Sequence, residues 1–406
     1  MKKLLTILFT FCFLQSITAS DIDLENITTS AVTLGMYSRT SSLIPITGNI
    51  EQLKYFFEAL KQARSKKLRI AHFGDSLIMG DIITGDLRAL YQGKYGGRGI
   101  GFMSPCNDDI MLRYTISHRF SDNWDWASVF TRNPKRYPLN IGGIMSVPSS
   151  SSTVSYEANR IYENSKEFKE VRIFYDKSNP LATVEIKTEN DQTQLSLPEA
   201  EGVFNEVNYT STGNINGVSL KFENNEGSYI YGISLENGPG VYVDNFAMRG
   251  NSGASLSKLN EKFLTESQEA LNYKLMVFNY GINIAEAGKT DYTWYKKKMI
   301  RIIEKFKKMY PETSMLLISA GDKAIKKGSR LISDSIVPVV VEVQKEIAME
   351  TGIAFWNLSD VINSDGGIVN WVDRGLVSKD YIHFNQKGGQ YVAEKLMQAL
   401  EEASKK

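Results

Sequence analysis

The stretch Leu-Arg-Ile-Ala-His-Phe-Gly-Asp-Ser-Leu-Ile-Met-Gly-Asp-Ile, residues 68–82, predicts a strand, a sharp turn and a helix in succession. The apolar run that begins at Leu68 is typical of a buried strand. Gly74 permits a tight turn after it, and Ser76 occupies that turn. Apolar residues then recur at helical spacing, which predicts a helix over residues 81–92. Ser76 is therefore expected at the tip of a strand-to-helix turn.

Two interpretations of Ser76 follow from this position. The free N–H groups at a helix N-terminus can stabilise an oxyanion, which suits a nucleophilic serine. Alternatively, Ser76 only caps the helix, as serines at such turns commonly do. The choice depends on which partner residues the rest of the chain supplies.

The first twenty residues have the features of a secretory signal peptide. Two lysines precede an apolar run over residues 4–14, and small residues end the segment at Ala19 and Ser20. The run is too short for a membrane span, which needs about 20 apolar residues, and no later stretch qualifies. We expect an exported protein, periplasmic or extracellular, that is soluble after cleavage and has no stable membrane span.

Composition excludes several classes of function. Loss of Lys2 and Lys3 with the signal peptide leaves 45 of the 47 basic residues against 46 acidic ones, so no nucleic-acid partner is expected. Cys106 remains alone once Cys12 is removed, which predicts a buried, inert thiol and no intrachain disulfide. No H-E-x-x-H motif or cysteine cluster occurs, so we expect neither a metal nor another cofactor.

The middle of the chain differs in character from its two ends. Short alternating runs separated by turn residues predict an all-β sandwich inserted over residues 104–240. Clear examples occur at residues 171–175, 182–187, 193–197, 218–222 and 230–235. The glycine-rich residues 93–102 lack a phosphate-binding pattern and are interpreted as a loop.

Strand and helix patterns alternate again after residue 240. Strands are expected near residues 68, 241, 275, 314 and 353, with helices between them. This alternation predicts an α/β fold, with a five-stranded parallel sheet of order 2-1-3-4-5 and helices on both faces. Residues 21–103 and 241–406 would form this discontinuous domain.

Polar residues follow the predicted strands where functional groups gather in open parallel sheets. In chain order, Gly-Asp-Ser-Leu at residues 74–77, a glycine after the second strand, Gly281-x-Asn283 and Asp380-x-x-His383 resemble the four blocks of the SGNH (GDSL) hydrolases. The resemblance covers residues 50–103 and 240–403. It implies a three-layer α/β/α domain.

The resemblance also implies a role for each matching residue. Ser76 would be the nucleophile, His383 the general base and Asp380 the group that orients it. The Ser76 amide, the Gly250 N–H and the Asn283 side-chain amide would form the oxyanion hole. The chemistry is coherent, since a serine hydroxyl needs a base, the base needs an orienting group and the oxyanion needs donors.

The β insertion and the ending around Trp371 and residues 375–384 resemble the peptidoglycan O-acetylesterases of that family. This implies a serine esterase that removes O-acetyl groups from cell-wall glycan through an acetyl-enzyme, with a carbohydrate-binding-like insertion. Two alternatives stay open: an O-acetyltransferase acting on a cell-wall or surface polysaccharide, and a non-catalytic glycan-binding protein. The oligomeric state is not predicted.

Other polar residues near the predicted site have simpler interpretations. His72 lies within the first strand and is expected to be a core histidine, and His118 is expected to be structural or superficial. Asp75 and Asp81 would brace the turn or cap the helix. Ser252 is a poorer candidate nucleophile, because no other feature of the sequence marks it.

Overall fold

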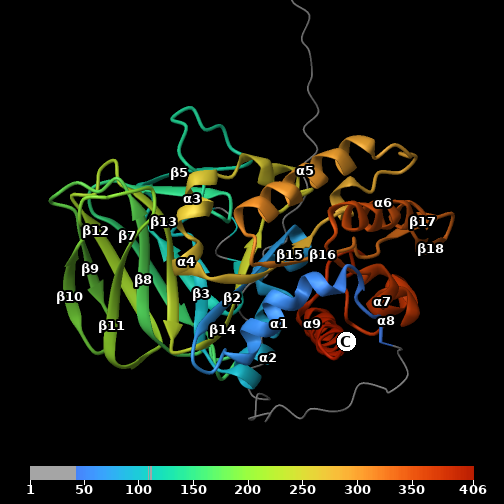
Figure 1. Ribbon diagram of the computed structural model, residues 1–406, viewed down its shortest axis with the longest axis horizontal. Helices are drawn as coiled ribbons and strands as arrows, with labels where there is room; N and C mark the ends of the chain where they lie inside the picture. Colours follow the sequence, from blue (N-terminus) through green and yellow to red (C-terminus); the bar gives the residue numbers. More distant parts are fainter. Residues whose placement is uncertain (1–42, 108, 110–111) are drawn as a thin grey trace, which may run out of the picture. The chain divides into compact units, whose positions relative to one another are not determined.

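The computed structural model describes residues 43–107, 109 and 112–406, and the predicted signal peptide lies outside them. Its central sheet has six strands (Figure 1). They lie in the order β1 (Thr47–Gly48), β19 (Ala354–Trp356), β16 (Ser314–Ile318), β15 (Tyr273–Asn279), β2 (Lys67–Gly74) and β14 (Gly240–Ala247). The predicted combination of an α/β region with a separate set of antiparallel strands is confirmed.

Five strands of this sheet run parallel to their neighbours, from β14 through β2, β15 and β16 to β19. In chain order this is 2-1-3-4-5, as predicted. The expectation of an all-parallel sheet was wrong, because β1 pairs antiparallel with β19, opposite Phe355 and Ala354. A two-residue strand shows no side-chain periodicity, so the sequence pattern could not reveal it.

Helices cover both faces of this sheet: α5 and α6 lie on one face, and α1, α2 and α9 on the other (Figure 1). Residues Met299, Ile302, Ile303 and Phe306 of α5 are buried, as the helical spacing predicted. The α-helices are α1 (Lys54–Lys61), α2 (Thr84–Tyr95), α3 (Glu261–Glu266), α4 (Gln268–Leu271), α5 (Thr293–Met309), α6 (Ile336–Thr351), α7 (Leu358–Ser364), α8 (Gly367–Asp373) and α9 (Gln386–Ala403). Short 3₁₀ helices include η2 (Ile50–Leu53), η3 (Ser76–Asp81), η5 (Ala254–Lys258) and η6 (Ile282–Ile284).

Two antiparallel sheets form the β region. One contains β10 (Gln192–Ser196), β9 (Thr183–Lys187), β12 (Gly217–Glu223), β7 (Ser152–Ala158) and β4 (Ile116–Phe120). The other contains β11 (Asn205–Ile215), β8 (Phe168–Asp176), β13 (Tyr229–Asn237), β6 (Ile144–Pro148), β5 (Trp124–Ser128) and, paired with β13, β3 (Arg98–Met103). Apolar side chains of both sheets share one buried core, as in a β-sandwich.

Strand β3 contradicts the prediction of a loop over residues 93–102. Glycines are depleted in strands, so the sequence favoured a loop. At Gly99, however, φ is +99° and a Cβ would lie 2.3 Å from the Leu235 carbonyl oxygen. The glycine lets β3 approach β13 closely, and pairing between distant segments overrides the local preference.

The β region is entered and left at one place. The Gly96 carbonyl accepts a hydrogen bond of 3.0 Å from Val241 N. A Cβ on Gly240 would lie 2.0 Å from Gly96 C, so only glycine fits there. Both neighbours of β2, namely β14 and β15, follow the β region in the chain.

The outer face of the β3–β13–β8 sheet packs against the α/β region. Phe102 of β3 stacks on Phe174 of β8 and meets Phe246 of β14 edge-on, with ring centroids 5.7 and 5.8 Å apart. Tyr231 of β13 lies 4.3 Å from Phe263 of α3 by the same measure. These residues belong to the core that also contains the central sheet. The two regions therefore share apolar packing.

A buried ion network joins the same two regions. Arg69 of β2 lies 2.7 Å from Asp244 of β14 and 2.6 Å from Glu236 of β13. Arg172 of β8 contacts Glu236 at 3.2 Å, and Lys67 does so at 2.9 Å. Because Arg69, Asp244 and Glu236 are at most 1% exposed, loss of one charge would leave another uncompensated in the interior.

Candidate active site

Ser76 lies at the carboxyl edge of the central sheet, between the segments that follow β14 and β15. It begins η3, and Asp75 separates it from the end of β2. Asp75 Oδ1 accepts a hydrogen bond of 3.0 Å from Leu77 N and caps the turn. The cap is therefore Asp75, and the Ser76 hydroxyl is left for other partners.

The helix predicted from residue 81 begins later, at Thr84. Gly80, Asp81 and Ile83 have φ angles of 72°, 73° and 66°, so the chain bends between η3 and α2. Left-handed backbone is costly for a β-branched residue such as Ile83 and persists only where the surroundings hold it. A regular period of apolar residues cannot reveal such a bend.

Buried charges hold this turn. Arg113 Nη2 lies 2.9 Å from Asp81 Oδ1, Arg88 Nη1 lies 3.4 Å from Asp81 Oδ2, and the Thr115 hydroxyl donates to the same carboxylate. Burial alone would raise the pKa of Asp81, but Arg113 and Arg88 hold it well below its usual range. Asp81 therefore braces the turn as a carboxylate, which is one of the roles predicted for it.

Asn245 of β14 supports the turn from the neighbouring strand. Its Nδ2 donates to the Ile78 carbonyl and to the Thr84 hydroxyl, both at 2.7 Å. The side chain thus ties η3 and the start of α2 to β14. The sequence did not predict this role, since an asparagine inside a strand carries no signal of its long-range partners.

The structure brings Ser76, His383 and Asp380 together. His383 Nε2 lies 2.8 Å from Ser76 Oγ, and His383 Nδ1 lies 2.7 Å from Asp380 Oδ2. Both distances are those of hydrogen bonds. Asp380 and His383 come from the loop between α8 and α9, more than 300 residues beyond Ser76.

The loop that carries Asp380 is ordered by the same carboxylate. Asp380 Oδ1 accepts hydrogen bonds of 3.0 Å from Ile382 N and from His383 N. Burial acts to raise the pKa of Asp380, but the hydrogen bonds from His383 and Ile382 outweigh it and lower that pKa. The side chains of Asp380 and His383 are 47% and 39% exposed, so water reaches the site.

The other two histidines are buried away from this loop. His72 lies within β2 fully buried, and burial lowers its pKa to about 4. His118, in β4, has Nε2 2.8 Å from the Pro105 carbonyl oxygen, and burial lowers its pKa to about 3. Both are neutral at pH 7, and both fit the structural roles expected of them. Ser252 has no histidine or carboxylate partner among residues 43–107, 109 and 112–406.

The predicted oxyanion donors lie on three neighbouring loops. Gly250 follows β14, and this loop is tied to the end of β2 by a 3.0 Å bond from Met248 N to the Gly74 carbonyl. Asn283 lies in η6 after β15, and its Nδ2 donates to the Asn251 carbonyl at 3.1 Å. The N–H groups of Ser76 and Gly250 have no acceptor within the part of the chain that the structure describes.

Asp75 is more unusual than the sequence indicated. Its carboxyl group is completely buried, and Oδ2 has no hydrogen-bond partner among the described residues. Burial raises the pKa of Asp75 to about 7, against smaller opposing contributions from the Leu77 N–H, His383 and the Asn283 side chain. An acid that can be neutral near pH 7 thus lies directly beside Ser76.

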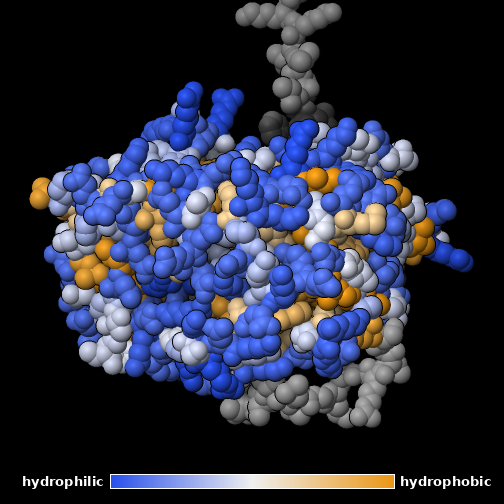
Figure 2. Space-filling view, in the orientation of Figure 1, coloured by the Kyte–Doolittle hydropathy of each residue, from blue (hydrophilic) through white to orange (hydrophobic). Residues whose placement is uncertain are grey.

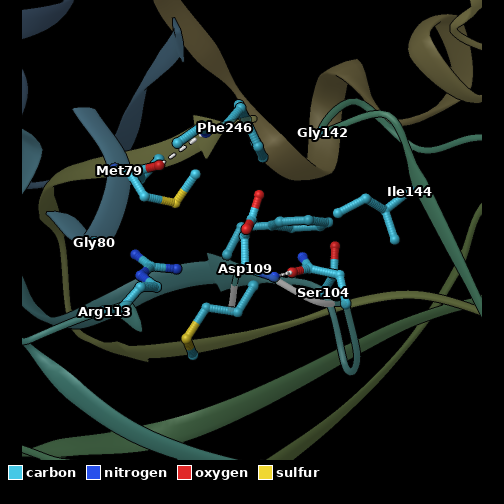
Figure 3. Close-up of a pocket in the computed structure, with 13 residues that line it drawn as sticks. Met79, Gly80, Ser104, Asp109, Arg113, Gly142, Ile144 and Phe246 are labelled. Carbon is cyan, nitrogen blue, oxygen red and sulfur yellow. Dashed lines mark hydrogen bonds between the residues drawn. The ribbon is translucent and has the colours of Figure 1, made fainter. Parts of the chain in front are cut away.

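A cavity of about 50 Å³ lies next to the turn, where the α/β and β regions meet (Figure 3). In this view Met79 and Arg113 face Ser104 and Ile144 across it. The full lining is Met79, Gly80, Phe102, Met103, Ser104, Asn107, Asp109, Arg113, Gly142, Ile144, Asn245, Phe246 and Ala247. The volume is too small for a sugar ring, but the lining shows that the β region reaches the turn that carries Ser76.

Two further properties concern only the described residues. No group of three or more His, Cys, Asp or Glu side chains among them is arranged to hold a metal ion. None of their helices is both long enough and apolar enough to cross a membrane. Cys106 is buried.

A hydrogen-bonded Ser-His-Asp set at the carboxyl edge of an α/β sheet is the side-chain arrangement that serine hydrolases use. Among solved structures, one described as "Peptidoglycan O-acetylesterase in action" aligns with 90% of this chain and 99% of its own, with a TM-score of 0.71 and 20% sequence identity. The chain therefore has the fold of that esterase, and the resemblance inferred from the sequence is confirmed at the level of the fold.

Other solved structures align with TM-scores below 0.5. A family two carbohydrate esterase from Cellvibrio japonicus aligns with 71% of this chain and 99% of its own, at 8% identity and a TM-score of 0.28. A GDSL-like lipase from Parabacteroides merdae aligns with 40% of this chain and 73% of its own, at 16% identity and a TM-score of 0.30. No protein-family model and no curated protein matches the sequence.

Proposed function

We propose that this chain is an exported serine esterase that removes O-acetyl groups from a cell-wall glycan, with peptidoglycan as its substrate. The observation that carries the proposal is the hydrogen-bonded set Ser76, His383 and Asp380. It occurs on the fold of a protein described as a peptidoglycan O-acetylesterase.

The first half of the reaction transfers the acetyl group to the enzyme. His383 Nε2 accepts the proton of Ser76 Oγ as this oxygen attacks the acetyl carbonyl. The tetrahedral oxyanion collapses and breaks the bond to the sugar oxygen. This oxygen receives from His383 the proton that Ser76 gave up, and leaves as a hydroxyl. The acetyl group is now an ester of Ser76. Asp380 holds His383 with Nδ1 protonated, so Nε2 can act as the base.

Water completes the cycle. His383 Nε2 takes a proton from a water molecule that attacks the acetyl-enzyme, and the same proton returns to Ser76 as acetate leaves. The exposure of His383 and Asp380, 39% and 47%, supports hydrolysis, because transfer to a sugar hydroxyl would require water to be kept out.

The proposed oxyanion donors are the Ser76 and Gly250 N–H groups and the Asn283 amide. Two N–H groups without an acceptor among the described residues, together with an amide on the adjacent loop, suit this role. The Asn283 amide has two N–H bonds. One donates to Asn251, and the amide also interacts with the Asp75 carboxyl, so the second N–H would turn from Asp75 to the oxyanion during the reaction.

The test is acetate release from O-acetylated peptidoglycan by the purified mature protein, with Ser76→Ala as the control. We expect release by the wild type alone. Acetate at the level of the Ser76→Ala protein would contradict the proposal. Fractionation of producing cells tests export, which predicts a shortened chain outside the cytoplasm.

A further inference from the structure

The hairpin formed by β17 (Ala324–Lys327) and β18 (Arg330–Ser333) begins at the same sheet edge as Ser76, beyond the end of β16. Its base is tied to a loop of the candidate site, since Ala324 N donates to the Tyr381 carbonyl at 3.1 Å. Tyr381 lies between Asp380 and His383. The hairpin therefore extends from the loop that holds the general base.

A second bond ties the hairpin to the loop that carries Asn283. Lys323 Nζ, one residue before β17, donates to the Ala285 carbonyl and pairs with Asp334 at 3.3 Å. Ala285 is two residues beyond Asn283. An isolated two-stranded hairpin is marginally stable in water, so these bonds at its base fix its direction.

The hairpin carries cations without carboxylates. Its sequence, Ala-Ile-Lys-Lys-Gly-Ser-Arg-Leu-Ile-Ser, contains Lys326, Lys327 and Arg330 and no acidic residue. All three cations are exposed, and none forms an ion pair with any residue that the structure describes. Lys327 and Arg330 lie directly opposite each other across the strands. Like charges in that position destabilise a hairpin, so the arrangement suits an external anion.

Apolar side chains accompany the cations. Ile325 and Ile332 form the neighbouring cross-strand pair on the face that carries Lys327 and Arg330, because side chains two residues apart share a face. Ile325 and Ile332 are each 38% exposed. At the edge where Figure 1 draws β17 and β18, Figure 2 shows hydrophobic and hydrophilic surface side by side. The hairpin offers both charge and apolar contact.

We infer that this hairpin binds the carboxylate-bearing parts of the wall polymer and holds an O-acetyl group within reach of Ser76. The inference rests on the proposed function and specifies its substrate, an anionic glycan such as peptidoglycan with its peptide carboxylates rather than a neutral acetylated polysaccharide. Lys326, Lys327 and Arg330 attract the polymer, while the apolar pair contacts its uncharged parts. Surface cations of this kind raise the rate of encounter with an anionic partner, and salt reduces the effect.

The experiment compares the full mature protein with the triple variant Lys326→Gln, Lys327→Gln and Arg330→Gln. The readout is kcat/KM on O-acetylated peptidoglycan sacculi divided by kcat/KM on 4-nitrophenyl acetate, which has no charge to recognise. We expect this ratio to fall about tenfold or more at low salt. The difference between the two proteins should shrink at high salt, because salt screens the exposed charges. An unchanged ratio overturns the inference.

The matched control removes three cations from the outer face of α5, through Lys297→Gln, Arg301→Gln and Lys308→Gln. It changes the net charge by the same amount, and we expect it to alter the ratio less than twofold. An equal loss in both triple variants overturns the inference, because it assigns the effect to net charge. Melting temperatures exclude misfolding as the cause.

Binding separates this inference from the proposed function. On a Ser76→Ala background, the protein is sedimented with peptidoglycan sacculi, with neutral chitin or with phosphatidylglycerol vesicles. If the hairpin variant loses binding to sacculi alone, the inference is supported, whether or not the wild type releases acetate. A wild type that releases no acetate would contradict the proposed function only. Unchanged binding to sacculi overturns the inference, as does a loss confined to vesicles, which would assign the hairpin to a lipid surface.

Discussion

Replacement of Asp380 by Asn tests the proposed catalytic set with little disturbance of the fold. In the native loop, Oδ1 of Asp380 accepts two backbone N–H bonds of 3.0 Å, and Oδ2 faces His383 Nδ1 at 2.7 Å. An asparagine can keep both backbone bonds through its carbonyl oxygen. Its NH₂ group then replaces Oδ2. Because NH₂ only donates, His383 Nδ1 must become the acceptor, and the ring proton moves to Nε2.

A proton on Nε2 points at Ser76 Oγ, 2.8 Å away, so His383 can no longer accept the serine proton. A histidine held in this wrong tautomer lowers kcat about 10⁴-fold, which is equivalent to about 5.5 kcal/mol of lost transition-state stabilisation. The assay is initial-rate kinetics on 4-nitrophenyl acetate, together with the melting temperature of each protein. We expect the melting temperature to stay within about 2 °C of the wild type, since the loop retains its backbone bonds.

Two comparisons sharpen this test. Asp373→Asn neutralises an exposed carboxylate on α8 in the same part of the chain, and we expect less than a twofold change in kcat from it. Asp380→Ala also removes the acceptor of the Ile382 and His383 N–H bonds, so its melting temperature should fall below that of Asp380→Asn. A folded Asp380→Asn protein that keeps more than a tenth of wild-type kcat would refute the reasoning.

The remaining predictions concern three other residues. Asn283→Ala should lower kcat about 10²–10³-fold with little change in KM if its amide donates to the oxyanion, whereas a lower melting temperature with normal kcat would make it a turn brace. Asp75 has a folded-state pKa of about 7 against about 3.9 when unfolded, so the folded protein binds the extra proton and loses about 4 kcal/mol of stability as pH rises from 4 to above 7. Asp75→Asn should remove this contribution to the pH slope in thermal unfolding, while Asp86, whose pKa burial raises to about 6, contributes a slope of the same sign in both proteins. Glu236→Gln should cost about 3–5 kcal/mol in denaturant unfolding, because Arg69 and Arg172 lose a buried partner. A loss below 1 kcal/mol would show that Asp244 compensates Arg69 and that Glu206 compensates Arg172.

The central sheet was predictable because each of its parallel strands is a short apolar run flanked by turns. Leu275–Asn279 and Ser314–Ile318, for example, are buried along their whole length, and burial on both faces leaves a continuous apolar signal. Strand β3 and the hairpin β17–β18 gave no such signal. The former is rich in glycine, and the latter mixes cations with apolar residues that remain exposed, without a regular alternation. Strand β3 forms by pairing with β13, far along the chain, and β17 pairs with β18 across the turn that joins them.

The sequence predicted which residues form the candidate site, but it did not predict the residues that hold them in place. Spacing and order singled out Ser76, Asp380 and His383, and the structure places them within hydrogen-bond distance. The role of Asn245 depends on contacts with Ile78 and Thr84, 167 and 161 residues away in the chain. Such contacts depend on the three-dimensional fold and leave no local pattern.

The meeting of Gly96 with Gly240 has a consequence for how the chain folds. Strand β2 cannot acquire either neighbour until β14 and β15 exist, and both follow the β region. Closing so long a loop between β2 and β14 would be slow if the intervening chain were unstructured. Once β3 pairs with β13, however, the chain near Gly96 and the chain near Gly240 are already close together. Strand β14 then needs to move only a short distance to pair with β2. The sandwich should therefore form first during refolding and act as the template on which the central sheet assembles.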